Sequence, residues 1–185
     1  MASVELVKHN LNFCKCIYEL SSAKPVKEAL GLPDGSIDNT KEFIKSVIQE
    51  EQEGKTLSRV ILDENSNVIG ITTLMSINNE KKSCHVGTWI GFDYWGKGYN
   101  EASKIVILKI AFEDLGLEKV FAGARKINIR SQKAQEKLPF IRLYVENEFP
   151  EEHAVLEEKE KQSCVLHAFF KDDFINYLHG TNQAL

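Results

Sequence analysis

The sequence contains no apolar run long enough to cross a membrane, because none of its stretches approaches the roughly 20 consecutive apolar residues that a spanning helix needs. The opening residues, Met1–Glu5, also lack the basic start and the long apolar segment of a secretory signal. We therefore expect no membrane partner and a cytoplasmic location.

Cysteine and surplus basic charge are scarce as well. The four cysteines form no C-x-x-C pair and have no histidine partner at the spacing of a metal site; they are Cys14, Cys16, Cys84 and Cys164. We expect reduced structural thiols and no bound metal, in keeping with a cytoplasmic setting. The formal net charge is −4, which argues against nucleic acid as a partner because phosphate contacts need a basic surface.

What remains is the composition of an ordinary globular protein. Hydrophobic residues make up 43% of the 185 residues and charged residues 27%, which is enough for a substantial core and too apolar for a disordered chain. No repeat, low-complexity tract or linker divides the sequence. We therefore predict a single domain over residues 1–185.

Hydrophobic periodicity predicts a mixed α/β fold with one central sheet. Helical patterns occur at residues 12–21, 25–30, about 40–50, 99–115 and 128–138. Strand patterns occur at residues 57–62, 68–75, 84–90, 120–124, 140–145 and 163–170. Asn39 or Thr40 is expected to cap the third helix, whose apolar face would comprise Phe43, Ile44, Val47 and Ile48. We expect an acidic, loop-like segment with a possible short helical piece at 146–161, and a short closing turn at 174–178.

The most informative segment is a strand followed by a glycine turn and a helix. The alternating strand at 84–90 leads to Gly96-Lys97-Gly98, and a helical pattern starts at Ala102. Glycines let the backbone come close to a ligand, and the first N–H groups of a helix have no internal partner. We therefore expect a phosphate-bearing cofactor at this turn.

Two familiar phosphate-binding motifs do not fit the turn. A P-loop needs serine or threonine after its Gly-Lys, whereas here Gly98 and Tyr99 follow Lys97. A dinucleotide fingerprint belongs in a first parallel βαβ unit, whereas this turn follows an antiparallel meander. On the glycines alone, a plain strand–helix turn that needs glycine for tight packing stays open.

Two segments of the chain resemble the GNAT N-acetyltransferase superfamily, in particular the ribosomal-protein N-terminal alanine and serine acetyltransferases. Residues 86–90 with Tyr94–Tyr99 resemble the acetyl-CoA-binding motif, and residues 128–140 resemble the family's Asn-x-x-Ser-x-x-x-x-Glu-Lys-x-Gly-Phe helix. The spacing between the two motifs also agrees. The resemblance implies a GNAT-like α/β fold, with flanking helices around a mixed, mostly antiparallel central sheet of six to seven strands.

The resemblance further implies acetyl-CoA as the acetyl donor. Its pyrophosphate would rest on backbone N–H groups of the turn, namely those of Gly96, Lys97, Gly98, Tyr99 and Asn100. The pantetheine arm would pair with the backbone of Thr88, Trp89 and Ile90, and an N–H group near Trp89 or Ile90 would polarise the thioester carbonyl. Asn128 matches the asparagine that contacts the pantetheine side of the cofactor.

Direct attack of an amine on the thioester needs a proton acceptor and a donor to the leaving sulfur. His85 lies on the strand before the turn, where relatives often carry glutamate, and an imidazole titrates near neutral pH; an ordinary strand histidine is the alternative. The carboxylates at 146–152 are the runner-up base, with a solvated acidic loop as their alternative. Many relatives carry a tyrosine donor at the position of Gln135, which cannot act as an acid, so we expect Ser131 to be the donor.

We therefore expect an acetyl-CoA-dependent N-acetyltransferase that acts on a primary amine: a protein N-terminus, a polyamine or another small amine. The acidic stretch at 146–160 favours a cationic acceptor. The expected partners are acetyl-CoA and this amine, with a second copy of the chain in a homodimer left open. Asn100 adds bulk where relatives have glycine or alanine. Asn100 and Gln135 together favour a second hypothesis, in which the protein is an acyl-CoA-binding or regulatory module with weak or no catalysis.

Overall fold

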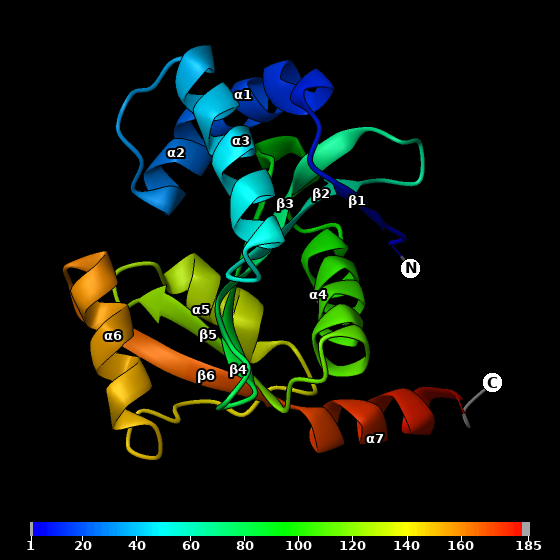
Figure 1. The fold of residues 1–185 in the computed structure, drawn as a ribbon, viewed down its shortest axis with the longest axis vertical. Helices are drawn as coiled ribbons and strands as arrows, with labels where there is room; N and C mark the ends of the chain where they lie inside the picture. Colours follow the sequence, from blue (N-terminus) through cyan, green and yellow to red (C-terminus); the bar gives the residue numbers. More distant parts are fainter. Residues whose placement is uncertain (1, 183–185) are drawn as a thin grey trace. The chain divides into compact units, whose positions relative to one another are not determined.

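The structure is a computed structural model that describes residues 2–182. Within them the strands form one six-stranded sheet in the order β1-β2-β3-β4-β5-β6 (Figure 1). The strands are β1 (Glu5–Lys8), β2 (Leu57–Leu62), β3 (Val68–Asn78), β4 (Ser83–Ile90), β5 (Lys119–Arg125) and β6 (Cys164–Phe170). β4 and β5 run parallel, whereas β1–β2, β2–β3 and β5–β6 are antiparallel pairs. The predicted α/β fold with a mostly antiparallel sheet is confirmed.

The chain divides into two compact units within β4. One unit comprises the chain as far as Ile77 together with Gly87–Ile110, and the other comprises Asn78–Val86 and the chain from Ala111 onward. The first unit therefore holds the glycine turn and the end of β4. The second unit holds the start of β4 with β5 and β6.

The first unit carries most of its helices before β2. They are η1 (Leu11–Phe13), α1 (Cys14–Ser22), α2 (Lys24–Leu30) and α3 (Ile37–Gln52), with η2 (Phe92–Tyr94) and α4 (Tyr99–Lys109) after β4. The expected cap of α3 at Asn39 or Thr40 is wrong, because Ser36 and Asn39 form a capping box that starts the helix at Ile37. β1 was not expected from the sequence, because four residues are too few to show a clear alternation.

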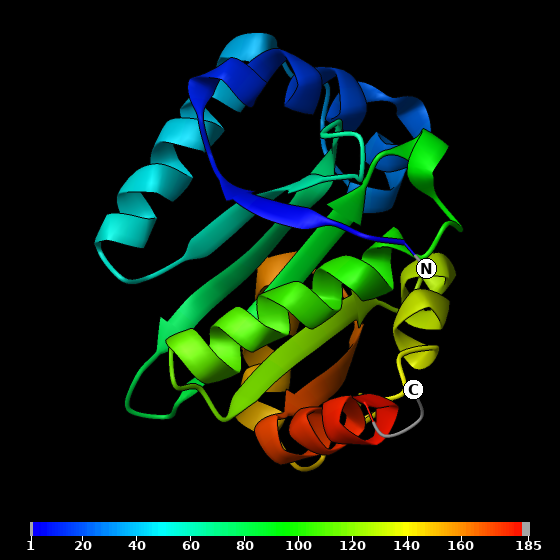
Figure 2. The ribbon, with the colours of Figure 1, turned by 90° about the vertical axis from the view of Figure 1, so that its right-hand side faces the viewer.

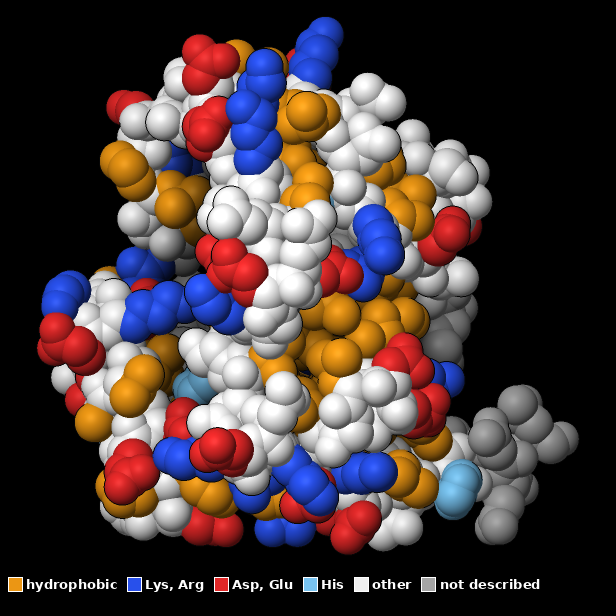
Figure 3. All heavy atoms as spheres, in the orientation of Figure 1, with side chains coloured by type: hydrophobic (Ala, Val, Ile, Leu, Met, Phe, Trp, Pro, Cys, Tyr) orange, Lys and Arg blue, Asp and Glu red, His pale blue; other side chains and the backbone are white. Residues whose placement is uncertain are grey.

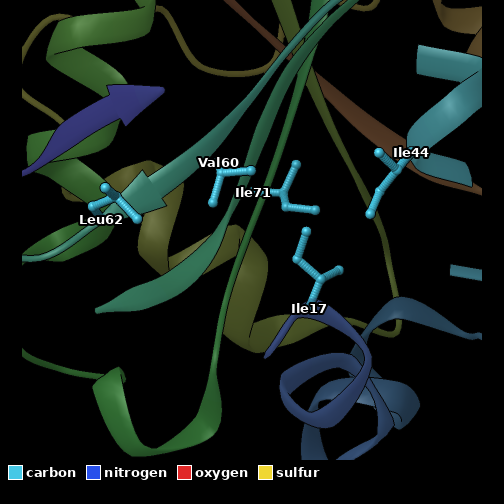
Figure 4. Close-up of a cluster of buried hydrophobic side chains, with 5 residues drawn as sticks. All are labelled: Ile17, Ile44, Val60, Leu62 and Ile71. Atoms are coloured by element: carbon cyan, nitrogen blue, oxygen red, sulfur yellow. The ribbon is translucent and has the colours of Figure 1, made fainter. Parts of the chain in front are cut away.

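Two apolar clusters hold the first unit together. Figure 4 shows Ile17 of α1 and Ile44 of α3 pointing toward Val60 and Ile71, two residues that are paired across β2 and β3. Ile61 and Ile69 point to the opposite face, where they form a cluster with Ile90 and Tyr99 at the start of α4. On that side α4 lies beside β1 (Figure 2). Burying one such aliphatic side chain contributes about 1.5–3 kcal/mol, so these contacts fix the helices on the sheet.

The apolar face of α3 is narrower than its periodicity predicts. Ile44 and Val47 are buried, as expected, whereas Phe43 remains 40% exposed and Ile48 36% exposed. Phe43 instead meets the His9 ring edge-on, with the ring centres 5.8 Å apart.

The second unit packs helices onto β5 and β6. After η3 (Ile110–Asp114), its helices are α5 (Ile129–Glu136), α6 (Pro150–Glu160) and α7 (Lys171–Asn182). Phe149 and Leu156 contact a core cluster that includes Phe121 and Leu166. A Cβ atom on Gly123 would lie 2.3 Å from Leu156, so glycine is what allows α6 to lie this close to β5.

Three expectations for the second half of the chain are wrong. Residues 140–145 form only an isolated bridge, Arg142 to Ala168, because Tyr144 adopts a left-handed φ of 56° that interrupts an extended run. The acidic segment is mostly helix: α6 spans 11 residues, more than the short helical piece that was expected as a possibility, and its proline at the first helical position and acidic first turn suit a helix N-terminus. The expected turn at 174–178 lies within the longer helix α7.

Candidate functional site

The glycine turn has the geometry of an anion-binding site. Gly96 and Gly98 adopt left-handed φ values of 73° and 85°, where other residues are strained. Gly98 is the N-cap of α4, and no side chain caps this helix. A Cβ atom on Gly96 would meet nothing within 4 Å, and Gly96, Lys97 and Gly98 are all exposed. The first N–H groups of α4 are thus open to an anion, which fits a pyrophosphate.

Side chains around the turn hold it in place. The buried Tyr99 donates its hydroxyl to the Glu64 carboxylate, 3.0 Å from each oxygen, and meets the Tyr94 ring at 6.0 Å. Lys97 is exposed, with Nζ 5.6 Å from the centre of the Tyr94 ring. Asn100 is half-buried and accepts a bond from Ser103 Oγ at its carbonyl. Among the residues expected to contact the cofactor here, Tyr99 uses its side chain in a hydrogen bond within the protein. Its backbone N–H group is the part that suits a ligand.

The backbone of β4 comes unusually close to β3 at Trp89. A Cβ atom on Gly70 would lie 2.2 Å from the Trp89 carbonyl oxygen and 3.1 Å from Ile90 Cα. Gly91 N–H donates to the Ile69 carbonyl at 2.7 Å, and Trp95 Nε1 donates to the Ile90 carbonyl at 2.7 Å. The segment expected to bind pantetheine is therefore fixed by backbone contacts. The role of Gly70 was not predicted, because a single glycine within a strand has no distinctive sequence pattern.

A buried cation lies beside Thr88. Lys104 of α4 is 5% exposed, and its Nζ donates to Thr88 Oγ1 at 2.8 Å. Thr88 Oγ1 in turn lies 2.8 Å from Thr72 Oγ1. Burial lowers the pKa of Lys104 to about 8. The hydroxyl of Thr88 is thus engaged within the protein, and its backbone is the part that suits a ligand.

In the second unit, His85 is paired with an acidic side chain of α6. His85 Nε2 lies 2.7 Å from Glu152 Oε2, and the two side chains are 14% and 22% exposed. The His85 ring also packs on Phe121 with the ring centres 5.3 Å apart. His85 and the carboxylates at 146–152 were expected as alternative bases, whereas His85 and Glu152 of this segment lie in direct contact.

Three polar residues of α5 form a local hydrogen-bond group. Asn128 Oδ1 caps the helix by accepting from Ser131 N–H at 3.1 Å. Gln135 Nε2 donates to the Gly123 carbonyl at 3.1 Å and to Ser131 Oγ at 3.3 Å. Because Ser131 Oγ accepts this bond, its own proton is available for another acceptor. Gln135 Oε1 is buried without a hydrogen-bond partner among residues 2–182, so it suits a ligand N–H group.

Further features of the described residues concern membrane-spanning helices, metal-binding groups, cysteines and surface charge. None of their helices is both long and apolar enough to span a membrane. Their histidine, cysteine and acidic side chains form no group of three suited to a metal ion. The four cysteines are free, and burial raises the pKa of the Cys84 thiol to about 12. On the face shown in Figure 3, acidic and basic side chains are interspersed over the described part.

The sequence profile of the acetyltransferase (GNAT) domain matches residues 16–141. The chain belongs to the GNAT acetyltransferase family. This acetyltransferase is accordingly an acyltransferase, and acetyl-CoA is its acetyl donor, as the resemblance implied. No curated protein matches its sequence.

Solved structures with the same fold accompany this assignment. A spermidine N-acetyltransferase from Vibrio cholerae, solved with CoA and spermine, has a TM-score of 0.72 at 14% identity over 94% of this acetyltransferase and 98% of that chain. The ribosomal alpha-N-protein acetyltransferase RimL has a TM-score of 0.72 at 15% identity, over 91% and 90%. The microcin self-immunity acetyltransferase MccE, solved with acetyl-CoA and AMP, has a TM-score of 0.70 at 16% identity, over 91% and 92%. At these identities the likeness concerns the fold alone.

Proposed function

We propose that this acetyltransferase transfers the acetyl group of acetyl-CoA to a primary amine, with His85 as the proton acceptor. The observation that carries this proposal is the hydrogen-bonded pair of His85 and Glu152, a partly exposed imidazole held against a carboxylate in a chain of the acetyltransferase family. An imidazole that is held against a carboxylate and stays partly exposed suits proton abstraction.

The donor would be held mainly by backbone groups. The open glycine turn favours a pyrophosphate on the N–H groups of Gly96, Lys97, Gly98, Tyr99 and Asn100. Thr88, Trp89 and Ile90 would pair with the pantetheine arm, and an N–H group at Trp89 or Ile90 would stabilise the charge that develops on the thioester oxygen. Asn128 would lie on the pantetheine side.

The reaction is a direct transfer. The protonated amine first loses one proton to His85. Its nitrogen then forms a bond to the thioester carbonyl carbon, the carbon–sulfur bond breaks, and the nitrogen loses its second proton while the CoA thiolate takes up one proton. Ser131 would donate its hydroxyl proton in a hydrogen bond to the leaving sulfur, which support from Gln135 Nε2 favours. The products are an N-acetylated amine and CoA.

The acceptor class follows from charge and from the relatives. Acidic residues are dense from Glu146 to Glu160, which favours a cationic amine. Relatives of the same fold include an enzyme named for spermidine and one named for a ribosomal protein N-terminus. Both acceptors carry a primary amine, so the proposal covers polyamines and protein N-termini.

The test combines turnover with binding. Acetyl-CoA is incubated with the protein and a panel of spermidine, spermine and peptides that begin with alanine or serine, and products are identified by mass spectrometry. Product mass avoids the background that the exposed Cys16 would give in a thiol assay. We expect an acetylated amine with at least one acceptor class, and calorimetry should show acetyl-CoA binding.

A second candidate function is an acyl-CoA-binding module without catalysis. It is favoured by Asn100 in the turn and by Gln135 at the usual position of a tyrosine donor. It predicts tight acetyl-CoA binding and no acetylated product from any amine. Absence of acetyl-CoA binding in calorimetry would contradict both functions.

A further inference from the structure

We infer that Glu152 is a positioning residue that keeps His85 in the tautomer with its proton on Nε2, so that Nδ1 is the atom that accepts the amine proton. This inference rests on the proposed function of His85 as the base. Glu152 lies on α6, in a segment that its sequence pattern predicts to be mainly a loop.

The chemistry of the contact decides the tautomer. An ionised carboxylate offers only acceptors, so the 2.7 Å contact between Glu152 Oε2 and His85 Nε2 requires a proton on Nε2. A neutral imidazole carries one proton on its ring nitrogens, which leaves the lone pair on Nδ1. No described residue makes a hydrogen bond to His85 Nδ1, and this atom is not among the fully buried unpartnered ones.

Helix α6 holds the carboxylate where His85 needs it. Phe149, directly before the helix, meets the Phe121 ring at 4.9 Å, and Phe121 is the ring on which His85 packs. One turn after Glu152, Leu156 fills the space above Gly123 on β5. The helix is thus fixed to β5 on both sides of Glu152, and the carboxylate position follows from that packing.

The other charged groups near the pair are bonded elsewhere. Glu151 lies 3.6 Å from Lys81, and Lys82 lies 3.1 Å from Glu118. On α6, His153 Nε2 contacts Glu157 at 3.1 Å and the Cys164 carbonyl at 2.9 Å. Within the described residues, Glu152 is therefore the carboxylate bonded to His85, and it would also stabilise the imidazolium that forms when Nδ1 takes a proton.

The first experiment reads the tautomer directly and needs no substrate. Long-range ¹⁵N–¹H spectra of the ¹⁵N-labelled protein, with His85→Gln for assignment, report which ring nitrogen of His85 carries the proton. We expect the Nε2-protonated form in the wild-type protein and a mixture of tautomers in Glu152→Ala. A wild-type His85 protonated on Nδ1 would overturn the inference.

The second experiment measures kcat and KM for an amine found in the acceptor panel. We expect Glu152→Ala to lower kcat about 10- to 100-fold, the range that loss of an orienting partner costs a metal-binding histidine. KM for acetyl-CoA should stay unchanged, because the pair is proposed to act on the amine proton and not on the donor. Glu152→Asp should recover part of the rate. Glu118→Ala, which removes an exposed carboxylate of the same unit outside the acidic stretch, is the matched control with wild-type behaviour.

The outcomes separate this inference from the proposed function. Wild-type kcat in Glu152→Ala, together with an active wild-type enzyme, overturns the positioning role and leaves the acetyltransferase function intact. A wild-type protein that acetylates no amine overturns the function of His85, and with it the positioning role of Glu152, whatever tautomer the spectra show.

Discussion

The region expected to hold acetyl-CoA and the region expected to move protons differ in the kind of group that would meet the ligand. At the glycine turn and at Trp89, the groups that suit a ligand are backbone N–H and C=O groups, fixed by Gly70, Gly96 and Gly98. At His85 and Ser131, the groups proposed to move protons are side chains, and each is hydrogen-bonded to another side chain: Glu152 and Gln135. The backbone region needs the absence of a Cβ atom, whereas the side-chain region needs a partner of the right chemistry.

This difference predicts separate kinetic effects. Changes at the glycines should weaken acetyl-CoA binding, because they move or strain the backbone that a pyrophosphate or pantetheine would meet. Changes at His85 should lower the rate constant of transfer and leave donor binding unchanged, because the imidazole is proposed to touch the amine proton alone.

The largest expected effect is that of His85→Gln. Loss of a general base typically costs about 100-fold or more in rate, so kcat should fall by about that factor while the Kd for acetyl-CoA by calorimetry stays constant. His153→Gln is the matched control, since it removes another partly buried imidazole of the same unit. A fall in acetyl-CoA affinity in His85→Gln would contradict the separation between donor binding and proton transfer.

Next comes Gly70→Ala, which adds one carbon 2.2 Å from the Trp89 carbonyl oxygen. Overpacking of this kind typically costs about 1–3 kcal/mol, and here the β4 backbone must give way. We expect a lower free energy of unfolding by urea denaturation and weaker acetyl-CoA binding. Gly87→Ala is a milder control, because its Cβ atom would lie 3.1 Å from the flexible end of Met75. Full acetyl-CoA affinity in Gly70→Ala would show that the donor does not depend on the Trp89 backbone.

Lys104→Met tests what the buried cation does for stability. Folding lowers the pKa of Lys104 from 10.5 to about 8, so between these pH values the unfolded chain binds more protons and the native protein gains stability as pH rises. Below pH 8, burial of the protonated Lys104 lowers the free energy of unfolding of the wild-type protein by about 3 kcal/mol. Lys104→Met removes this penalty, but it also removes the hydrogen bond to Thr88, which contributes about 1 kcal/mol. We expect the variant to gain about 2 kcal/mol at pH 7 and to lose this advantage near pH 10.5.

The measurement for Lys104→Met is chemical denaturation at several pH values. A variant that is less stable than wild type at pH 7 would contradict the desolvation argument. Thr72→Val serves as control, because it removes a hydroxyl of the same group and leaves the charge of Lys104 in place.

The smallest expected effect belongs to the pair Gly98→Ala and Gly54→Ala. Both glycines have a left-handed φ, 85° and 74°, so alanine should cost each about 1 kcal/mol in stability. Only Gly98 lies at the start of α4, so only Gly98→Ala should also weaken acetyl-CoA binding, by up to about tenfold. Equal acetyl-CoA affinities of the two variants would show that the glycine turn does not bind the cofactor.

Local pattern was sufficient for much of the fold. The helix predicted at 99–115 appears as α4 and η3, and the strands at 57–62 and 84–90 appear as β2 and β4. Each of these segments has a clear period and is bounded by glycine or polar turns. Residues 140–145 have the composition of a strand, but Tyr144 turns out of the extended region, and no local pattern reveals that.

The sequence by itself determined the family, the acetyl donor and the glycine turn, because a left-handed backbone at a helix start requires glycine at fixed local positions. Only the tertiary structure decided which side chains meet. Glu152 reaches His85 across 67 residues, and Gly70 lies under Trp89. Such contacts depend on how helices and strands pack, and packing brings together residues that share no local signal.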